Sequence, residues 1–266
     1  MTDQTVLYHL DDHGVAWVTL NRPDKRNAFG GPVIAELLDA LERARKAPEC
    51  RALVVAGNGK HFSAGADLDY MRQSAELSEA ENIDDARTLA RLMDSLDRFP
   101  APTIARVQGA AFGGALGLVC CCDMVLAAED ARFCLSETRL GLAPSTIGPY
   151  VVRAMGARQA RRYFLSAEEI DGHRAQELNL VHQVVPGEGL DEAVNTLLAR
   201  LLKNGPQAQA ACKELIARIG QDQPDDALMD FTARQIARLR TGDEAQEGLA
   251  AFLEKRPASW VEGGLE

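Results

Sequence analysis

The sequence contains no long apolar run, no signal-peptide pattern and no low-complexity window. A membrane-spanning helix needs roughly 18 consecutive apolar residues, and no stretch of this 266-residue chain approaches that length. Residues 1–4 are polar and lack the basic and then apolar segments of a signal peptide. We therefore expect a cytoplasmic, globular protein without a membrane partner, and not a disordered or collagen-like chain.

Clustered positive charge is absent as well. The chain has 29 Lys and Arg against 39 Asp and Glu, a formal net charge of −10, and the acidic surplus is spread along its length. Nucleic-acid-binding proteins contact phosphates with clustered Lys and Arg. We therefore expect no nucleic-acid partner, and any polyanionic ligand must be held by local cations and backbone N–H groups.

The six cysteines lack the spacing of a metal or redox site. Cys120, Cys121 and Cys122 are adjacent, so their side chains point in different directions and cannot share one metal ion. No pair is spaced as CxxC. Because free cysteines are commonly buried, the sequence predicts structural thiols and no metal site.

Strands and helices alternate over the first part of the chain, which predicts an α/β core over residues 1–190. Beyond residue 141 the pattern is helical, interrupted only by a strand at 181–185, and residues 191–266 are predicted to be a helical region. Isolated helices of this length need tertiary partners, so we expect the region to pack rather than swing free. The strands expected in the core lie at 6–10, 15–20, 52–56, 103–107, 124–128 and 132–135, and its main helices at 32–45, 83–99 and 113–122.

Three segments carry candidate chemistry. Residues 61–68 follow a strand and a Gly-rich turn, and their small side chains let a ligand lie against the backbone. In residues 107–117 a helix begins at Gly113 and Gly114, where unpaired N–H groups suit a phosphate or an oxyanion. Residues 135–144 place Glu137 among apolar and small side chains, where the pKa of a carboxyl can rise and protons exchange near neutrality.

Each segment alone also fits a structural interpretation. The first can be a plain turn from a strand to a helix, and Asp67 is a suitable residue to begin that helix. The glycines of the second can serve close helix packing, and the glutamate of the third can be an ordinary surface residue. The glycines of the second segment do not follow the GxGxxG dinucleotide pattern, and the Lys-Ser/Thr of a P-loop is missing. An enzyme that uses NAD or ATP is therefore not indicated.

Taken together, in this order and spacing, the three segments resemble the enoyl-CoA hydratase/isomerase superfamily, which has the crotonase fold. The resemblance covers nearly the whole chain and includes residues 21–23 and 26–28 near the start and 252–256 near the end. It implies a spiral of ββα units with a C-terminal helical region that forms trimers, often paired into hexamers. It also implies that no cofactor is bound, because coenzyme A is part of the substrate.

The resemblance gives roles to individual residues. The backbone N–H groups of Ala66 and Gly114 would bind the thioester oxygen, on which charge builds as an enolate forms, and Glu137 would move a proton at the α-carbon. The residues implied to contact coenzyme A are Lys25, Arg26, Ala28, Ala64, Gly65, Asp67, Leu68, Gly113 and Lys255.

One position departs from the family pattern. Family hydratases use a second glutamate at the position of Gly117, whereas isomerases need only the base at Glu137. Residues 109–114 and 133–150 nevertheless look like bacterial methylglutaconyl-CoA hydratases of leucine breakdown, whose substrate carries a second carboxylate that could help activate water. The resemblance therefore implies a hydro-lyase acting on an enoyl-CoA, in particular 3-methylglutaconyl-CoA. The alternatives are a 3,2-enoyl-CoA isomerase and a non-catalytic acyl-CoA-binding relative. The cation for a distal carboxylate could be Arg139, Arg153 or neither.

Overall fold

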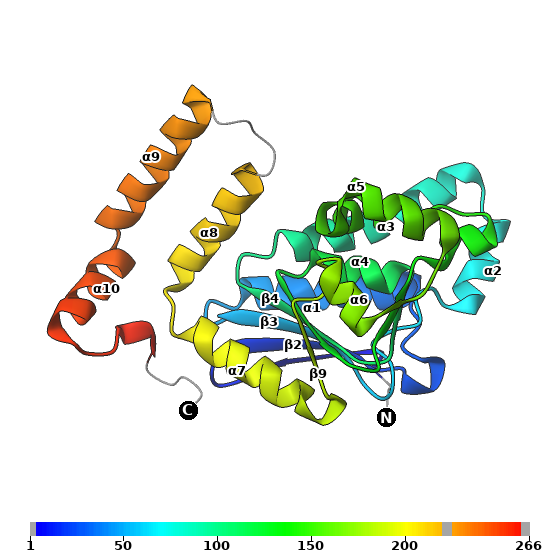
Figure 1. Ribbon diagram of the computed structural model, residues 1–266, viewed down its shortest axis with the longest axis horizontal. Coiled ribbons are helices and arrows are strands. Elements are labelled where there is room, and N and C mark those ends of the chain that lie inside the picture. The colour runs from blue at the N-terminus through cyan, green and yellow to red at the C-terminus, as the bar shows by residue number, and fades with distance from the viewer. Residues whose placement is uncertain (1–3, 220–224, 262–266) are drawn as a thin grey trace.

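A six-stranded sheet lies at the centre of the computed structural model, which describes residues 4–219 and 225–261 (Figure 1). A tight turn at Gly14 joins β1 to β2, which pair antiparallel, and every other pair of neighbouring strands is parallel. The carboxyl ends of parallel strands share one edge of a sheet, so the segments that follow β2, β3, β4 and β6 meet there. The strand order is β1 (Val6–Leu10), β2 (Val15–Leu20), β3 (Ala52–Gly57), β4 (Thr103–Val107), β6 (Met124–Ala128) and β9 (Gln183–Val185).

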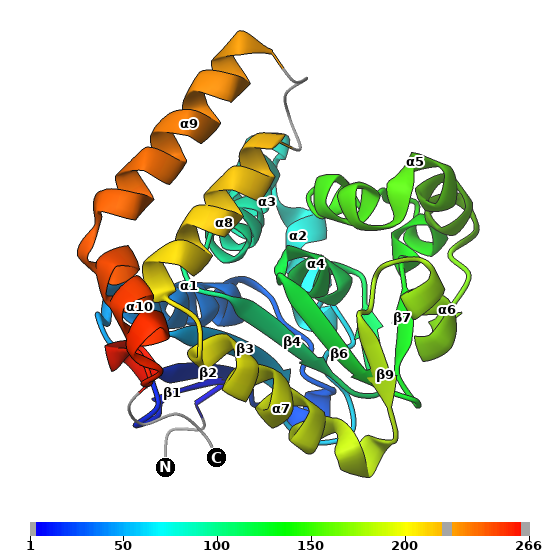
Figure 2. The ribbon, with the colours of Figure 1, turned by 60° about the vertical axis from the view of Figure 1, so that its left-hand side comes forward.

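Successive side chains of the strands point to opposite faces of the sheet and belong to two separate apolar layers. Leu53 and Val55 of β3 join the larger core cluster, while Val54 faces the opposite side. This burial on both faces explains the uninterrupted apolar run of β3. Helices α3, α4 and α5 lie on one side of the sheet and α7 on the other (Figures 1 and 2). The bounds of the helices around the sheet are α1 (Gly31–Lys46), α3 (Glu79–Asp97), α4 (Gly114–Cys121), α5 (Gly148–Ser166), α6 (Gly172–Glu177) and α7 (Leu190–Leu202).

A second, three-stranded sheet contains two strands that sequence patterns do not predict. It consists of β5 (Ala110–Phe112), β7 (Arg132–Cys134) and β8 (Ile170–Asp171). The expectation that 181–185 holds the only strand after residue 141 is wrong, because β8 pairs with β7. Strands of two and three residues are too short to show alternation of polar and apolar side chains.

Helix α2 (Leu68–Glu76) is a further element without a predictive pattern. It begins after Asp67, whose side chain accepts a hydrogen bond from the Asp69 N–H, so the expected role of Asp67 in opening a helix is confirmed. None of its residues is buried, so it contributes no apolar face to the core.

The helical region at the end of the chain extends from one end of the core (Figure 1). It comprises α8 (Pro206–Ile219), α9 (Asp226–Thr241) and α10 (Asp243–Glu254). The core itself continues past residue 190, because Leu190, Val194 and Leu198 of α7 pack on the sheet.

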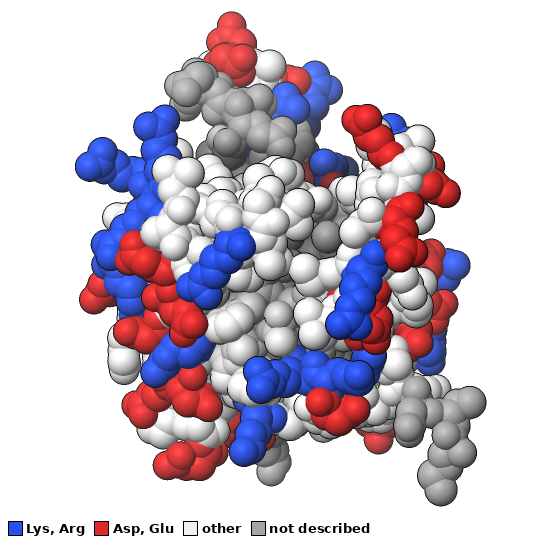
Figure 3. Space-filling view, turned by 90° about the vertical axis from the view of Figure 1, so that its right-hand side faces the viewer, with Lys and Arg blue, Asp and Glu red and all other residues white. Residues whose placement is uncertain are grey.

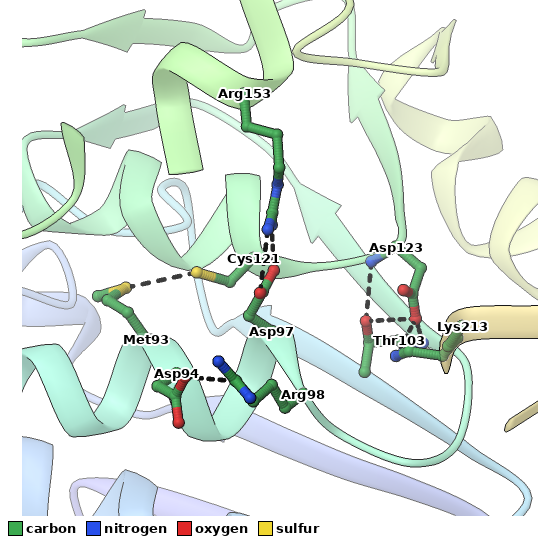
Figure 4. A network of polar contacts seen from close by, with 9 residues as sticks. All are labelled: Met93, Asp94, Asp97, Arg98, Thr103, Cys121, Asp123, Arg153 and Lys213. Carbon is green, nitrogen blue, oxygen red and sulfur yellow. Dashed lines mark hydrogen bonds and ion pairs between the residues drawn. The ribbon is translucent and has the colours of Figure 1, made fainter. Parts of the chain in front are cut away.

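Helix α8 is tied to the core by an ion pair. The Lys213 Nζ lies 2.5 Å from an Asp123 carboxylate oxygen and donates to the Ala101 carbonyl at 3.1 Å (Figure 4). Asp123 also accepts from the N–H and hydroxyl of Thr103, at the start of β4.

No helix in the described ranges is long and apolar enough to cross a bilayer.

Candidate active site

Three segments converge at the carboxyl edge of the central sheet. The segment after β3 runs alongside β5, because Ser63 bridges Ala111: the Ser63 N–H donates to the Ala110 carbonyl, and the Phe112 N–H to the Ser63 carbonyl. Gly113 then donates its N–H to the Cys134 carbonyl of β7 at 2.8 Å. The first two of the segments singled out in the sequence thus lie side by side, and the third begins directly beyond β7.

Two backbone N–H groups at this edge have no protein acceptor. Phe29 donates to the Gly65 carbonyl and accepts from the Asp67 N–H, so it pairs with the groups on either side of Ala66, and the Ala66 N–H is directed away from Phe29. Gly114 is the first residue of α4, where a helix leaves its N–H groups free. Within the described chain, neither the Ala66 nor the Gly114 N–H donates to a protein group.

The backbones that carry these two N–H groups are in close contact. A side chain on Gly65, whose φ is +89°, would come within 2.6 Å of the Phe112 carbonyl oxygen and 3.8 Å of the Gly113 Cα. A side chain on Gly114 would lie 3.2 Å from the ring of Phe29, the residue that bridges Ala66. A pair of preorganised N–H donors of this kind suits an oxygen that becomes negatively charged during a reaction.

The Glu137 carboxyl stands beside the start of α4. It belongs to a 3-10 helix, η2 (Ser136–Leu140), and its Oε1 is 3.3 Å from the place where a Cβ on Gly113 would be. Its Oε2 is buried without a hydrogen-bond partner. Burial raises the pKa of Glu137 above its ordinary value, against the lowering effect of a hydrogen bond from its own backbone N–H. A half-buried carboxyl with an unpartnered oxygen and a raised pKa is suited to proton transfer.

The residues expected to contact coenzyme A, with one exception, lie around this edge. Lys25 ends a short 3-10 helix, η1 (Pro23–Lys25), and Arg26 follows it with a left-handed backbone. Both side chains are exposed and pair with no acidic group in the part of the chain that the structure describes. Leu68 is 70% exposed at the start of α2. Charged side chains of both signs border an uncharged central area on this end of the molecule (Figure 3).

Comparison with known proteins identifies the family. The enoyl-CoA hydratase/isomerase family model matches residues 11–263. The chain belongs to this family. Its fold is the expected crotonase fold, since an enoyl-CoA hydratase from Shewanella pealeana superposes with a TM-score of 0.94 at 47% identity, over 97% of both chains.

Relatives of this enzyme include both hydratases and an isomerase. It is 34% identical to a 2,3-dehydroadipyl-CoA hydratase of Escherichia coli, over 91% of this chain and 93% of the relative. It is 29% identical to a trans-2-decenoyl-acyl-carrier-protein isomerase of Streptococcus mutans, over 96% and 97%. The family is therefore shown, whereas these names leave the individual reaction open.

The structure explains why residue 117 is glycine in this enzyme. A Cβ on Gly117 would lie 2.3 Å from Cγ2 and 2.8 Å from Cβ of Ile147, and 3.1 Å from the Met93 sulfur. Ile147, at the start of α5, and Met93, in α3, are both buried. Apolar side chains thus fill the space that the second glutamate of family hydratases would need. Glu137 therefore has no second glutamate at this position beside it.

Lys255 does not lie with the other expected contacts of coenzyme A. It follows α10, and Trp260 a few residues later accepts a hydrogen bond from Arg51, which precedes β3. Pro23 of η1, in contrast, packs near Gly59, which follows β3. The two places are therefore separated by the length of β3, about 20 Å for six residues. Figure 1 likewise shows α10 and α2 at opposite ends of the molecule.

The two arginines considered for a distal substrate carboxylate differ in their contacts within the described chain. Arg139 donates to the Ala167 carbonyl at 2.5 Å. Arg153 is paired with Asp97 of α3 (Figure 4).

A hydrogen bond between the Tyr70 hydroxyl and Asp85 joins α2 to α3, and sequence patterns gave no sign of it.

Proposed function

We propose that this enzyme adds water across the α,β double bond of an enoyl-CoA, with 3-methylglutaconyl-CoA as its preferred substrate. One observation carries the proposal: the half-buried Glu137 carboxyl, with an unpartnered Oε2, lies beside Gly113, at the start of the helix that carries the acceptor-free Gly114 N–H and next to the segment that carries the acceptor-free Ala66 N–H. These are the groups that chemistry at the α-carbon of a thioester requires.

In the proposed reaction the thioester oxygen accepts hydrogen bonds from Ala66 and Gly114. As the hydroxyl of water bonds to the β-carbon, the π electrons move onto the thioester and form an enolate, and Glu137 then gives its proton to the α-carbon. Each N–H donor typically lowers such a barrier by about 2.7–4 kcal/mol. Burial favours the protonated form of Glu137 that this step needs.

The remaining proton of the attacking water needs an acceptor, and Gly117 and Ile147 leave no room for a second glutamate. A carboxylate at the far end of the substrate can take this proton. The name of the Escherichia coli relative points the same way, because adipyl, like glutaconyl, denotes a diacid. This reasoning favours a dicarboxylic enoyl-CoA over a simple one.

The substrate proposal is tested by the decay of the absorbance of the conjugated thioester. We expect kcat/KM for 3-methylglutaconyl-CoA to exceed that for crotonyl-CoA at least about tenfold, since loss of the water-activating group typically costs ~10²–10⁴-fold. An equal or higher value for crotonyl-CoA would contradict a role of the distal carboxylate. Binding of both esters without turnover would instead indicate a non-catalytic acyl-CoA-binding protein.

A single carboxylate also supports a second candidate, the isomerisation of a 3-enoyl-CoA to a 2-enoyl-CoA. Glu137 would remove a proton from the α-carbon and return it to the γ-carbon while the double bond moves. The presence of Gly117 and the isomerase among the relatives favour this candidate.

The pH dependence of kcat distinguishes the two candidates. Hydration as proposed begins with protonated Glu137, so kcat is expected to fall as the pH rises through the raised pKa of Glu137. Isomerisation begins with the carboxylate, so kcat would rise with pH through the same pKa. A profile measured with 3-methylglutaconyl-CoA that rises through this range would contradict the proposed role of Glu137 as the acid.

We further propose that copies of this chain associate as a trimer or a dimer of trimers. Large apolar side chains are exposed on the helical region, among them Ile216 at 70%, Phe252 at 79% and Leu253 at 69%. Association would cover them. It could also bring the Lys255 of one copy to the coenzyme A of another, because α10, which Lys255 follows, lies at the opposite end of the molecule from α2. A monomer by size-exclusion chromatography with light scattering would contradict this.

A further inference from the structure

Two loops of the site are bonded together along their length. We call residues 22–29 the coenzyme loop, because it contains Lys25 and Arg26, and residues 58–67 the oxyanion loop, because it contains Ala66. The Ala64 N–H donates to the Arg26 carbonyl at 2.9 Å. The Phe29 N–H donates to the Gly65 carbonyl at 2.9 Å, and the Phe29 carbonyl accepts from the Asp67 N–H at 3.0 Å. The backbones of the two loops are therefore hydrogen-bonded side by side.

The side chain of Asn27 ties the same loops together from inside the protein. It is only 1% exposed, and its backbone has a φ of +54°, a conformation that asparagine tolerates better than most residues. Its amide donates to the Asn58 carbonyl at 2.9 Å and to the His61 carbonyl at 2.8 Å. Its oxygen accepts from the Arg22 N–H at 2.8 Å. One buried side chain thus bonds both loops.

Ser63 completes this connection. Its hydroxyl, fully buried, donates to the Asn27 carbonyl at 2.7 Å and accepts from the Gly65 N–H at 3.1 Å. Gly65 is the residue directly before Ala66. The chain of hydrogen bonds from Asn27 therefore ends one peptide unit from the N–H group that faces the thioester.

The oxyanion loop is also bonded to β5, because the Ser63 N–H donates to the Ala110 carbonyl and the Ser63 carbonyl accepts from the Phe112 N–H. Ala66 is exposed, and α2, which follows it, has no buried residue. On that side the chain is held by Asp67, through its 2.8 Å ion pair with Arg22, and Arg22 itself belongs to the coenzyme loop and donates to the Ala28 carbonyl. The coenzyme loop therefore bonds the chain on both sides of Ala66, through the Gly65 carbonyl and through Asp67, whereas α2 contributes no buried residue there.

We infer that Asn27 is a positioning residue, through which coenzyme A bound at Lys25 and Arg26 holds the Ala66 N–H at the thioester oxygen. The inference rests on the proposed function. Its consequence is that the nucleotide end of the substrate, remote from the reacting carbons, raises kcat as well as affinity. Binding energy from a remote group has this effect when it maintains the geometry at the reacting centre.

The kinetic test compares crotonyl-CoA with crotonyl-pantetheine, which lacks the nucleotide. Asn27→Asp keeps the size of the side chain but places a carboxylate where two N–H donors face carbonyl oxygens, and Ser63→Ala removes the second connection. Asn179→Asp is the matched control, because Asn179 also has a left-handed backbone, with φ +62°, but is exposed beyond the end of α6.

In the wild type, kcat with crotonyl-CoA is expected to exceed kcat with crotonyl-pantetheine at least about tenfold, because small displacements of a catalytic group cost up to ~10²-fold. In Asn27→Asp and Ser63→Ala this ratio should fall towards one, through loss of kcat with crotonyl-CoA. The control should keep the wild-type ratio. Equal kcat for both substrates in the wild type, or an equal loss on both substrates in the variants, would overturn the inference.

A second measurement does not depend on turnover. Adenosine 3′,5′-bisphosphate, a fragment of coenzyme A without an acyl group, is expected to slow amide hydrogen exchange in residues 63–67 of the wild type and of Asn179→Asp, but not of Asn27→Asp. If the wild type shows no such protection, the inference is wrong. If the wild type hydrates no enoyl-CoA, the proposed function is wrong, and the exchange measurement still decides whether the two loops are coupled.

Discussion

Replacing Glu137 by glutamine is expected to lower kcat by about 10²–10⁴-fold, the usual effect of removing a general acid or base. The variant keeps the shape of the side chain beside Gly113 but cannot give up a proton to the α-carbon. Glu169→Gln, at an exposed glutamate, serves as the control and should keep full activity. Full hydratase turnover by Glu137→Gln would contradict the single-carboxylate mechanism.

The same variant is expected to be at least as stable as the wild type. Because burial raises the pKa of Glu137 in the folded state, the folded protein holds this proton more tightly than the unfolded chain does. Stability therefore falls as the pH rises from below the unfolded pKa through the folded pKa, and glutamine has no such loss. The urea midpoint of Glu137→Gln should exceed that of the wild type at pH 7, and the difference should shrink at pH 4.

Replacing Gly117 by glutamate is expected to destabilise the protein by about 3 kcal/mol or more. Inserting atoms into a packed core costs about 1–3 kcal/mol, and here the new Cβ would lie 2.3 Å from Ile147, with a carboxylate to bury as well. Combined with Ile147→Ala, which removes the nearest obstructing atom, Cγ2, and keeps the Cβ, the same glutamate should be better tolerated. The double variant should then lose less stability than the sum of the two single variants.

The double variant also tests why the substrate is proposed to carry a carboxylate. A glutamate at position 117 would supply the missing acceptor for the proton of water, so hydration of crotonyl-CoA should rise relative to Ile147→Ala alone. Ile147→Val, which removes one methyl group and adds no acid, is the control. If Gly117→Glu alone is as stable as the wild type, Ile147 does not fill this space as described.

The central sheet could be predicted in detail because its signals are local. The strands at 6–10, 15–20, 103–107 and 124–128 are confirmed with the expected bounds. For 103–107 the reason is clear, since Pro102 precedes a short segment whose Ile104, Ala105 and Val107 are buried on the two faces of the sheet. By contrast, α2 has no buried face, and β5 and β8 have too few residues to show a pattern.

The candidate site could be predicted only in part. Glu137, Ala66 and Gly114 followed from resemblance to a family, and the structure brings their segments together. The roles of Asn27 and Ile147 had no signal in the sequence, because they depend on contacts made by folding. The Asn27 amide bonds residues 31 and 34 positions away, and the methyl group that fills the space beside Gly117 comes from another helix.

The central claim is that this enzyme adds water to an enoyl-CoA, and the mass of the product tests it most directly. The wild type is incubated with 3-methylglutaconyl-CoA in water labelled with oxygen-18, alongside Glu137→Gln. We predict a product heavier by one labelled water in the wild type and almost none in the variant. Wild-type enzyme that forms no heavier product, but converts a 3-enoyl-CoA to its conjugated isomer without change of mass, would contradict the account.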